Sequence, residues 1–166
     1  MLGVPSFVMT EGGWEVEFYA DEYGREPCRE WAEGLSPVKK AAFKAAVEIV
    51  LSGQGIDVVR TEFGKALGDG LYELRIRQSG DEIRQRVAGL PSHDLGRRPH
   101  EAVLLRVFFC TDGPRIILLM SGYDKGRHSS TRRQSKEIEK ARTYMRAHRE
   151  AKQRAAKAAR RGPRSV

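Results

Sequence analysis

Two strongly apolar segments separated by a short turn constrain the fold of this chain more than any other feature. Residues 103–110 read VLLRVFFC and residues 115–123 read RIILLMSGY. Thr-Asp-Gly-Pro at 111–114 is typical of a tight turn, so the two segments predict a β-hairpin. A third strand is predicted over residues 70–77, GLYELRIR, and a fourth over residues 14–19, where apolar and acidic residues alternate.

Helical periodicity predicts two helices between the first strand and the other three. A short amphipathic helix is predicted over residues 22–35, with Trp31 and Leu35 on one side. Ser36 is followed by proline, an N-cap and first-turn pair, and apolar residues then recur at helical spacing. We expect Gly53 to end this second helix.

Positive charge is concentrated in the last quarter of the 166-residue chain. Residues 125–166 hold 15 Lys/Arg and 3 Asp/Glu, a net charge of +12, whereas residues 1–124 carry −4. This polarity predicts a polyanionic partner, which is either nucleic acid, the ribosome, a membrane surface or an acidic protein.

The C-terminal segment predicts a basic helix with one short apolar stripe. Ser135 is a candidate cap, and Ile138, Ala141 and Met145 form the stripe. Beyond His148 the apolar residues are alanines until the final residue, so we expect residues 151–166 to be solvated and frayed without a partner. The tail is either a nucleic-acid-binding arm or an end that serves solubility.

The pattern of apolar residues and cysteines narrows the class of protein. Apolar runs are far shorter than a membrane span, and the first ten residues lack the features of a secretion signal. Cys28 and Cys110 are too few for a disulfide framework, and their apolar flanks predict free core thiols. We expect a cytoplasmic protein with no membrane partner.

The order of elements indicates a small α+β domain. Residues 78–102, which are rich in Gly, Pro and charge, are predicted to be a surface insertion.

Arg106 is the most informative charged residue, because it interrupts an apolar strand. Its guanidinium needs an anion, which is either Glu73 in a structural pair or a bound phosphate. Arg75 shares a face with Glu73 on another strand, and this face is either solvated or part of the same site. Tyr123 and Lys125 belong either to a flexible basic linker or to that site. If the hairpin forms, four residues converge on adjacent strands: Arg75, Arg106, Tyr123 and Lys125.

The ordered set of motifs resembles the RelE/HigB-type toxins of type II toxin–antitoxin systems, specifically their phage-derived HigB-like branch. The motifs are GLYELRIR, LRVFF, RIILL, a Gly-Tyr-Asp-Lys turn and a Ser/Thr-rich basic linker into SKEIEKAR. The likeness covers residues 14–146. Residues 1–13 are then an N-terminal extension and residues 147–166 a basic C-terminal tail.

This resemblance implies an endoribonuclease that cleaves mRNA on the ribosome, an mRNA interferase. The implied fold is RelE-like: a small curved, mainly antiparallel sheet packed against two N-terminal helices, here followed by the basic C-terminal helix. The implied partner is an antitoxin, in this branch a helix-turn-helix protein. Family members place basic residues where Arg75, Arg106 and Lys125 fall. These residues activate the RNA 2′-hydroxyl without a metal, giving a 2′,3′-cyclic phosphate and a free 5′-hydroxyl.

General chemistry suggests a role for each candidate. Arg75 and Arg106 stabilise the negative charge that develops on the phosphoryl oxygens. Arginine is too weak a base to take a proton, so Lys125 or Tyr123 transfers it, with His128 as a third candidate. We assign four further residues to RNA binding: Lys65, Arg77, Arg127 and His128.

Three features depart from the family pattern: the 78–102 insertion, Gly126 in place of a second lysine, and the long basic tail. The alternative function is a non-catalytic nucleic-acid-binding or regulatory module on the same fold, and a third is a structural adaptor to an antitoxin-like partner. The four histidines lack metal-ligand spacing, so we expect no metal and no cofactor.

Overall fold

The computed structural model describes residues 7–8, 13–90 and 101–163. They form an α+β fold around one sheet with strand order β1-β2-β6-β5-β4-β3. Neighbouring strands are antiparallel except for β2 and β6, which run parallel, so the predicted mainly antiparallel sheet is confirmed. The strands are β1 (Phe7–Val8), β2 (Glu15–Phe18), β3 (Gly64–Gly68), β4 (Leu71–Ile76), β5 (Leu105–Thr111) and β6 (Ile116–Asp124).

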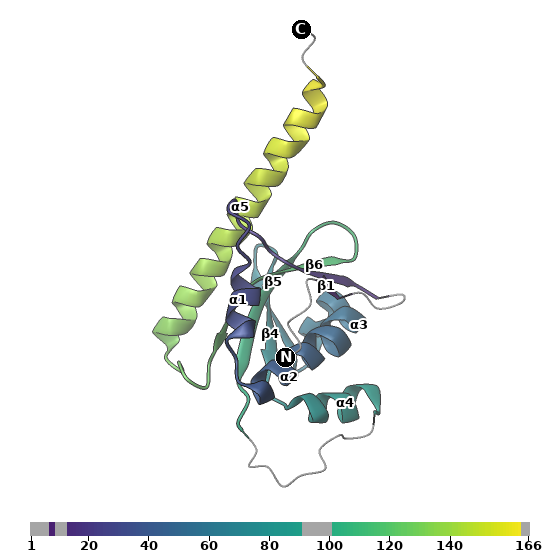
Figure 1. Ribbon diagram of the computed structural model, residues 1–166, viewed down its shortest axis with the longest axis vertical. Coiled ribbons are helices and arrows are strands. Elements are labelled where there is room, and N and C mark those ends of the chain that lie inside the picture. The colour runs from purple at the N-terminus through teal and green to yellow at the C-terminus, as the bar shows by residue number, and fades with distance from the viewer. Residues whose placement is uncertain (1–6, 9–12, 91–100, 164–166) are drawn as a thin grey trace.

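Helices cover both faces of the sheet, and each face has its own apolar core (Figure 1). The first face packs against α1 (Pro27–Glu33), α2 (Pro37–Ala45) and the segments that continue α2, namely the π-helical η1 (Ala46–Leu51) and α3 (Ser52–Gln54). The 3₁₀ helix η2 (Gly55–Arg60) and α4 (Gly80–Ala88) complete this layer. The second face packs against α5 (Thr131–Arg161) through Leu71, Phe108, Met120, Ala141 and Met145.

The predicted hairpin is confirmed, with β5 and β6 paired from Leu105 to Asp124. Ser36 caps α2 as predicted, since its Oγ accepts a hydrogen bond from the Lys39 backbone N–H at 3.4 Å. The predicted end at Gly53 is wrong, because the helical path continues to Gln54. Gly55 stops it with φ = 58°, in a region that favours glycine.

The predicted surface insertion at residues 78–102 is wrong for its first part, which forms α4. Ser79 caps this helix, and Ile83 is fully buried in the first core. Gly80 lies so close to α2 that a Cβ there would be 3.0 Å from the Ala41 carbonyl oxygen. The centre of the predicted insertion, residues 91–100, lies outside the described residues, as do most of residues 1–13.

Helix α5 begins earlier and ends later than predicted. Ser130, rather than Ser135, caps it by accepting from the Arg133 backbone N–H at 3.1 Å. The helix continues to Arg161 instead of fraying from residue 151, although residues 149–161 are all exposed. The predicted stripe is confirmed: Ala141 and Met145 are buried, and Ile138 packs beside them. Figure 1 shows the C-terminal half of α5 extending beyond the other elements.

Two other predictions are tested directly. Cys28 and Cys110 are both buried free thiols, as expected. None of the described helices combines the length and apolar character that a membrane span needs, and α5, the longest at 31 residues, is strongly charged.

Candidate functional site

The register of the sheet brings three predicted site residues into one row. Arg75 on β4 lies opposite Arg106 on β5, and Arg106 lies opposite Tyr123 on β6. Because directly opposite residues point to the same face of a sheet, all three side chains lie on the α5 face. Lys125 follows β6 immediately. Its pKa is lowered by partial burial and by the guanidinium of Arg106, with smaller effects from Arg75 and Arg77, so it lies within the electrostatic field of the row.

Glu73 holds both arginines. Its side chain is fully buried, and Oε1 accepts a hydrogen bond from Arg75 Nε at 2.8 Å. The same oxygen is 3.6 Å from Arg106 Nε, and Arg106 also donates to the Leu105 carbonyl at 3.2 Å. The structural pair with Glu73 is therefore present, one of the two alternatives that the sequence leaves open. A single carboxylate serves two guanidinium groups.

Positive charge remains in excess after this pairing. Arg106 and Lys125 are each influenced by one carboxylate, Glu73, and by the positive charges of Arg75 and Arg77. Burial lowers the pKa of Arg106, and Glu73 opposes that shift. Such an arrangement stabilises a bound anion, because the cations are already held in place and partly withdrawn from water.

Three buried polar atoms of the site have no hydrogen-bond partner in the described part of the protein. They are Glu73 Oε2, Arg106 Nε and the Tyr123 hydroxyl. Buried donors and acceptors are normally paired, so each of these atoms has room for a further partner such as a water, an ion or a ligand. The donors among them suit phosphate oxygens.

Tyr123 is a fixed donor. Its ring stacks on Phe108 with centroids 6.1 Å apart and planes at 11°. Burial, followed by the nearby Glu73 carboxylate, raises the pKa of its hydroxyl, so the group is protonated at neutral pH. It can give a proton or a hydrogen bond, but it is a poor base.

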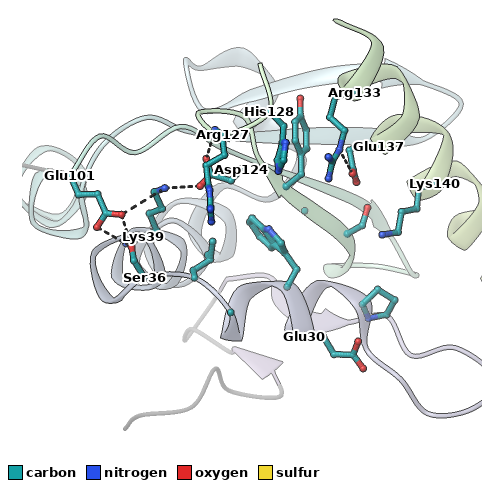
Figure 2. Close-up of a pocket in the computed structure, with 17 residues that line it drawn as sticks. Glu30, Ser36, Lys39, Glu101, Asp124, Arg127, His128, Arg133, Glu137 and Lys140 are labelled. Carbon is teal, nitrogen blue, oxygen red and sulfur yellow. Dashed lines mark hydrogen bonds and ion pairs between the residues drawn. The ribbon is translucent and has the colours of Figure 1, made fainter. Parts of the chain in front are cut away.

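Lys125 lies in a turn that follows β6. Figure 2 shows Asp124, which organises this turn through its bonds to Lys39 and Arg127. The Asp124 carboxylate accepts from Lys39 Nζ at 2.6 Å and from the Arg127 backbone N–H at 3.3 Å. The backbone N–H groups of Arg127 and His128 donate to the Asp124 carbonyl, and that of Gly126 donates to the Leu104 carbonyl. Sequence reasoning missed Lys39 and Asp124 as positioning residues. The only available signal was an acidic residue beside Lys125.

The other predicted site residues lie around the row. Lys65 on β3 is opposite Glu73 and exposed, and Arg77 is exposed directly after β4. Arg127 and His128 are exposed and line a cavity beside Tyr123. Within the described residues, no group of three or more His, Cys, Asp or Glu side chains is placed to hold a metal ion.

No protein-family model, curated protein or solved structure matches this chain.

Proposed function

We propose that this protein is an endoribonuclease that cleaves mRNA by attack of a 2′-hydroxyl on the adjacent phosphate, as the toxin of a type II toxin–antitoxin system. The observation that carries the proposal is the row Arg75–Arg106–Tyr123 beside Lys125, with more cations than carboxylates. The resemblance to the RelE/HigB-type toxins points to the same residues. On this proposal the fold is RelE-like, and the protein acts in the cytoplasm on translating ribosomes.

The arginines of the row would stabilise the transition state. In-line attack forms a bond from the 2′-oxygen to phosphorus and breaks the bond from phosphorus to the 5′-oxygen. Negative charge builds on the non-bridging oxygens, and Arg106 and Arg75 are held by Glu73 where they can share it. The products are a 2′,3′-cyclic phosphate and a free 5′-hydroxyl.

Two proton transfers would complete the reaction. Lys125, whose pKa is lowered, is the candidate that takes the 2′-hydroxyl proton. Tyr123, whose pKa is raised, is the candidate that protonates the 5′-oxygen as it leaves. His128 remains a third candidate for proton transfer, since it is exposed on the same turn.

RNA binding would use cations on both sides of the row. Lys65, Arg77 and Arg127 are exposed, so they can contact phosphates without reading sequence. A helix-turn-helix antitoxin, the partner that the resemblance implies, would bind this protein and inhibit its activity.

The second candidate function is a non-catalytic nucleic-acid-binding module. It is favoured by the pairing of Arg75 and Arg106 with Glu73, which is also what a purely structural network would show. It is favoured further by the six Lys/Arg of residues 149–161, all exposed on α5. This alternative predicts RNA binding without cleavage.

The test is to induce the protein in cells and map RNA 5′ ends. We expect new ends within translated codons, each with a 5′-hydroxyl. Arg106→Ala should lower cleavage about 100- to 1,000-fold, the usual loss for one transition-state donor. Arg86→Ala removes an exposed cation on α4 and should leave cleavage unchanged.

Arg75→Ala is a second test variant, included because Arg106→Ala can fail to fold. Arg106→Ala leaves the buried Glu73 carboxylate with one partner fewer and so destabilises the fold. Arg75 is 26% exposed, so its loss is better tolerated, and Arg106 still accompanies Glu73. Intact messages in cells that contain soluble wild-type protein would refute the proposal, as would full cleavage by both folded variants.

A further inference from the structure

A cavity of about 630 Å³ opens beside the proposed catalytic row, between α1, β6 and the start of α5 (Figure 2). It lies along the part of β6 that has no neighbouring strand on its outer side, because the pairing with β2 ends at Phe18 and Leu119. Ser121, Gly122 and Tyr123 of β6 line it. Its size is that of an ordinary small-molecule site.

Every carboxylate on the cavity wall already has a cationic partner. Glu30 pairs with Arg25, Glu101 and Asp124 pair with Lys39, and Glu137 pairs with Arg133.

Two cations on the same wall have no carboxylate partner within the described part of the chain. They are Arg127 and Lys140, both exposed, and the exposed imidazole of His128 lies on the same wall. Because Lys39 is shared by two carboxylates, the wall together with Arg25 holds five Lys/Arg against four carboxylates, so a small excess of positive charge remains. An anion is the ligand that this wall favours.

An aromatic ring also lines the cavity. Trp31 of α1 lies against the backbone of Gly122, where a Cβ would come within 2.3 Å of the indole. It also meets Phe43 edge-on, with centroids 5.9 Å apart and planes at 86°. These contacts fix the ring, yet Trp31 stays partly exposed and lines the cavity. A fixed, partly exposed indole is a surface on which a nucleobase stacks.

Two buried hydroxyls also line the cavity without a partner. Ser121 and Tyr123 are 3% and 2% exposed, and neither Ser121 Oγ nor the Tyr123 hydroxyl makes a hydrogen bond within the described protein. A polar ligand would satisfy both groups. Tyr123 belongs to the catalytic row as well, so cavity and row share one residue.

We propose that this cavity binds a single nucleotide of an RNA strand, next to the phosphate held by the catalytic row. The base stacks on Trp31, and the phosphate of that nucleotide lies near Arg127, His128 and Lys140. Ser121 and Tyr123 donate to the sugar or the phosphate. This inference rests on the proposed function for the position of the nucleotide in the substrate, but the binding can be measured without cleavage.

The experiment uses fluorescence of the full chain. The protein has two tryptophans, so a Trp14→Phe variant leaves Trp31 as the reporter. A 2′-O-methylated RNA trinucleotide, which lacks the attacking hydroxyl, is titrated into this variant. We expect saturable quenching of the Trp31 emission. A trinucleotide with one abasic position should bind roughly five- to a hundredfold more weakly when that position enters the cavity, the loss expected for one stacked base. Inorganic phosphate alone should not quench.

Two variants separate the cavity from general electrostatic attraction. Arg127→Ala, made in the Trp14→Phe background, should weaken trinucleotide binding about tenfold. Arg86→Ala removes an equal charge on α4, outside the cavity, and should leave it unchanged. Binding that leaves the Trp31 emission constant, or that responds equally to both variants, would overturn the inference.

The outcome also separates this inference from the proposed function. Quenching by the trinucleotide in a protein that never cleaves RNA would support the cavity and refute the nuclease. RNA cleavage by a protein whose Trp31 emission ignores the trinucleotide would support the nuclease and refute the cavity.

Discussion

Glu73 is the residue on which the candidate site depends. Alternation along β4 places Glu73 and Arg75 on the face of Arg106, and the register then lets one buried carboxylate hold both guanidinium groups. Glu73 is fully buried, so it acts as a positioning residue that does not touch the substrate. The strand register brings Arg75 and Arg106 opposite each other, and the Glu73 carboxylate orients their guanidinium groups.

Tyr123 reaches the site because of a local irregularity in β6. Leu118 and Met120 point into the α5-side core, and simple alternation would then send Tyr123 to the other face. The β5–β6 register shifts between Phe108 and Phe109, and after the shift Tyr123 also lies in the α5-side core. A β-bulge thus aims this side chain at Arg106.

The pH dependence of cleavage tests Lys125 as the base. Only the neutral amine accepts a proton, so the rate should rise with pH and level off above the lowered pKa of Lys125. Arg77 contributes to this lowering, so Arg77→Ala should raise the pKa of Lys125 and move the rising limb to higher pH. Single-turnover rates over a range of pH measure the shift.

Arg77→Lys is the matched control for this shift. It keeps the positive charge, so the limb should stay in place even if RNA binding weakens. The base would be another group if the rising part of the pH–rate profile stayed in place in Arg77→Ala. The same would follow if the rise with pH persisted in Lys125→Arg.

At the scale of elements, the path of the chain after α2 depends on one backbone conformation. Gly55 has φ = 58° and ψ = −136°, and a Cβ there would lie 2.1 Å from the Trp14 ring. The positive φ of Gly55 ends the long helical segment and changes the direction of the chain, so that η2 and β3 follow directly.

Gly55→Ala should therefore be strongly destabilising, by about 2 kcal/mol or more, because it combines backbone strain with a steric clash. Gly53→Ala is the matched control. Its added Cβ meets nothing within 4 Å, and alanine is a better helix former, so stability should be unchanged or rise by up to about 1 kcal/mol. Urea unfolding measures both variants, and equal stability of the two would refute the argument.

Polar contacts add to the apolar stripe in anchoring the middle of α5. Arg142 donates to the Leu67 carbonyl at 2.8 Å, and Arg149 donates to the Asp69 carbonyl at 3.1 Å. At the neighbouring β5–β6 turn, Asp112 is paired with His148 and hydrogen-bonded to Lys152. Two turns at one end of the sheet thus hold the helix beyond its apolar stripe.

Asp112→Asn should lower the free energy of unfolding by roughly 0.5–1 kcal/mol at pH 7, a modest value because Lys152 is 58% exposed. Burial opposes the shift, but the hydrogen bond from Lys152 and the nearby His148 imidazole leave the pKa of Asp112 below its usual value. A lowered folded-state pKa stabilises above the unfolded value, and that contribution is lost as pH falls through the folded value.

The difference between wild type and Asp112→Asn should therefore shrink below about pH 4, near the ordinary pKa of an aspartate. Urea unfolding at pH 7 and pH 3 measures it. Glu150→Gln changes an exposed acid on the same helix and should have little effect at either pH. An Asp112→Asn effect that is constant across this range would contradict the pairing.

At the scale of the whole molecule, the proposed catalytic row and the two turns that anchor α5 lie at opposite ends of the sheet. Antiparallel pairing puts the end of β4, the start of β5 and the end of β6 together, and puts the β3–β4 and β5–β6 turns at the far end. Helix α5 spans this distance and then extends past the turns (Figure 1). Its exposed C-terminal part is therefore a second basic surface, separate from the row.

The exposed part of α5 is cationic mainly on one side. At 100° per residue, six basic residues fall within about 140° of arc, while most of the alanines occupy the opposite side. The six are Arg146, Arg149, Arg154, Lys157, Arg160 and Arg161. Such a face suits the phosphate backbone of RNA.

Ending the chain after Lys152 removes five Lys/Arg residues while keeping both anchored turns. RNA affinity should fall, and the slope of log K against log salt should become shallower by about 0.7 for each phosphate that the tail no longer neutralises. The cleavage rate at saturating RNA should stay the same, because the row is untouched. Exchanging the same arginines for lysine keeps the charge and should keep the slope. An unchanged slope after truncation would mean that the tail does not bind RNA.

Local patterns in the sequence were sufficient to define which residues form the central strands, where α2 begins and which faces carry Arg75 and Arg106. These features depend on neighbours a few positions away, through alternation, capping and turn residues. Strand β3 was not predicted, because its five residues, GKALG, include two glycines and little alternation. Helix α4 was hidden in a polar segment, since Ile83 is its only fully buried apolar side chain.

Contacts between distant parts of the chain settled the rest: Glu73 holds two arginines, a bulge turns Tyr123 toward them, and Lys39 and Asp124, 85 residues apart, support the turn at Lys125. The length of α5 likewise depends on contacts to turns that are about 40 and 80 residues away along the chain. Ion pairs and packing between distant residues leave no periodic trace in a sequence, so they follow only from the folded arrangement.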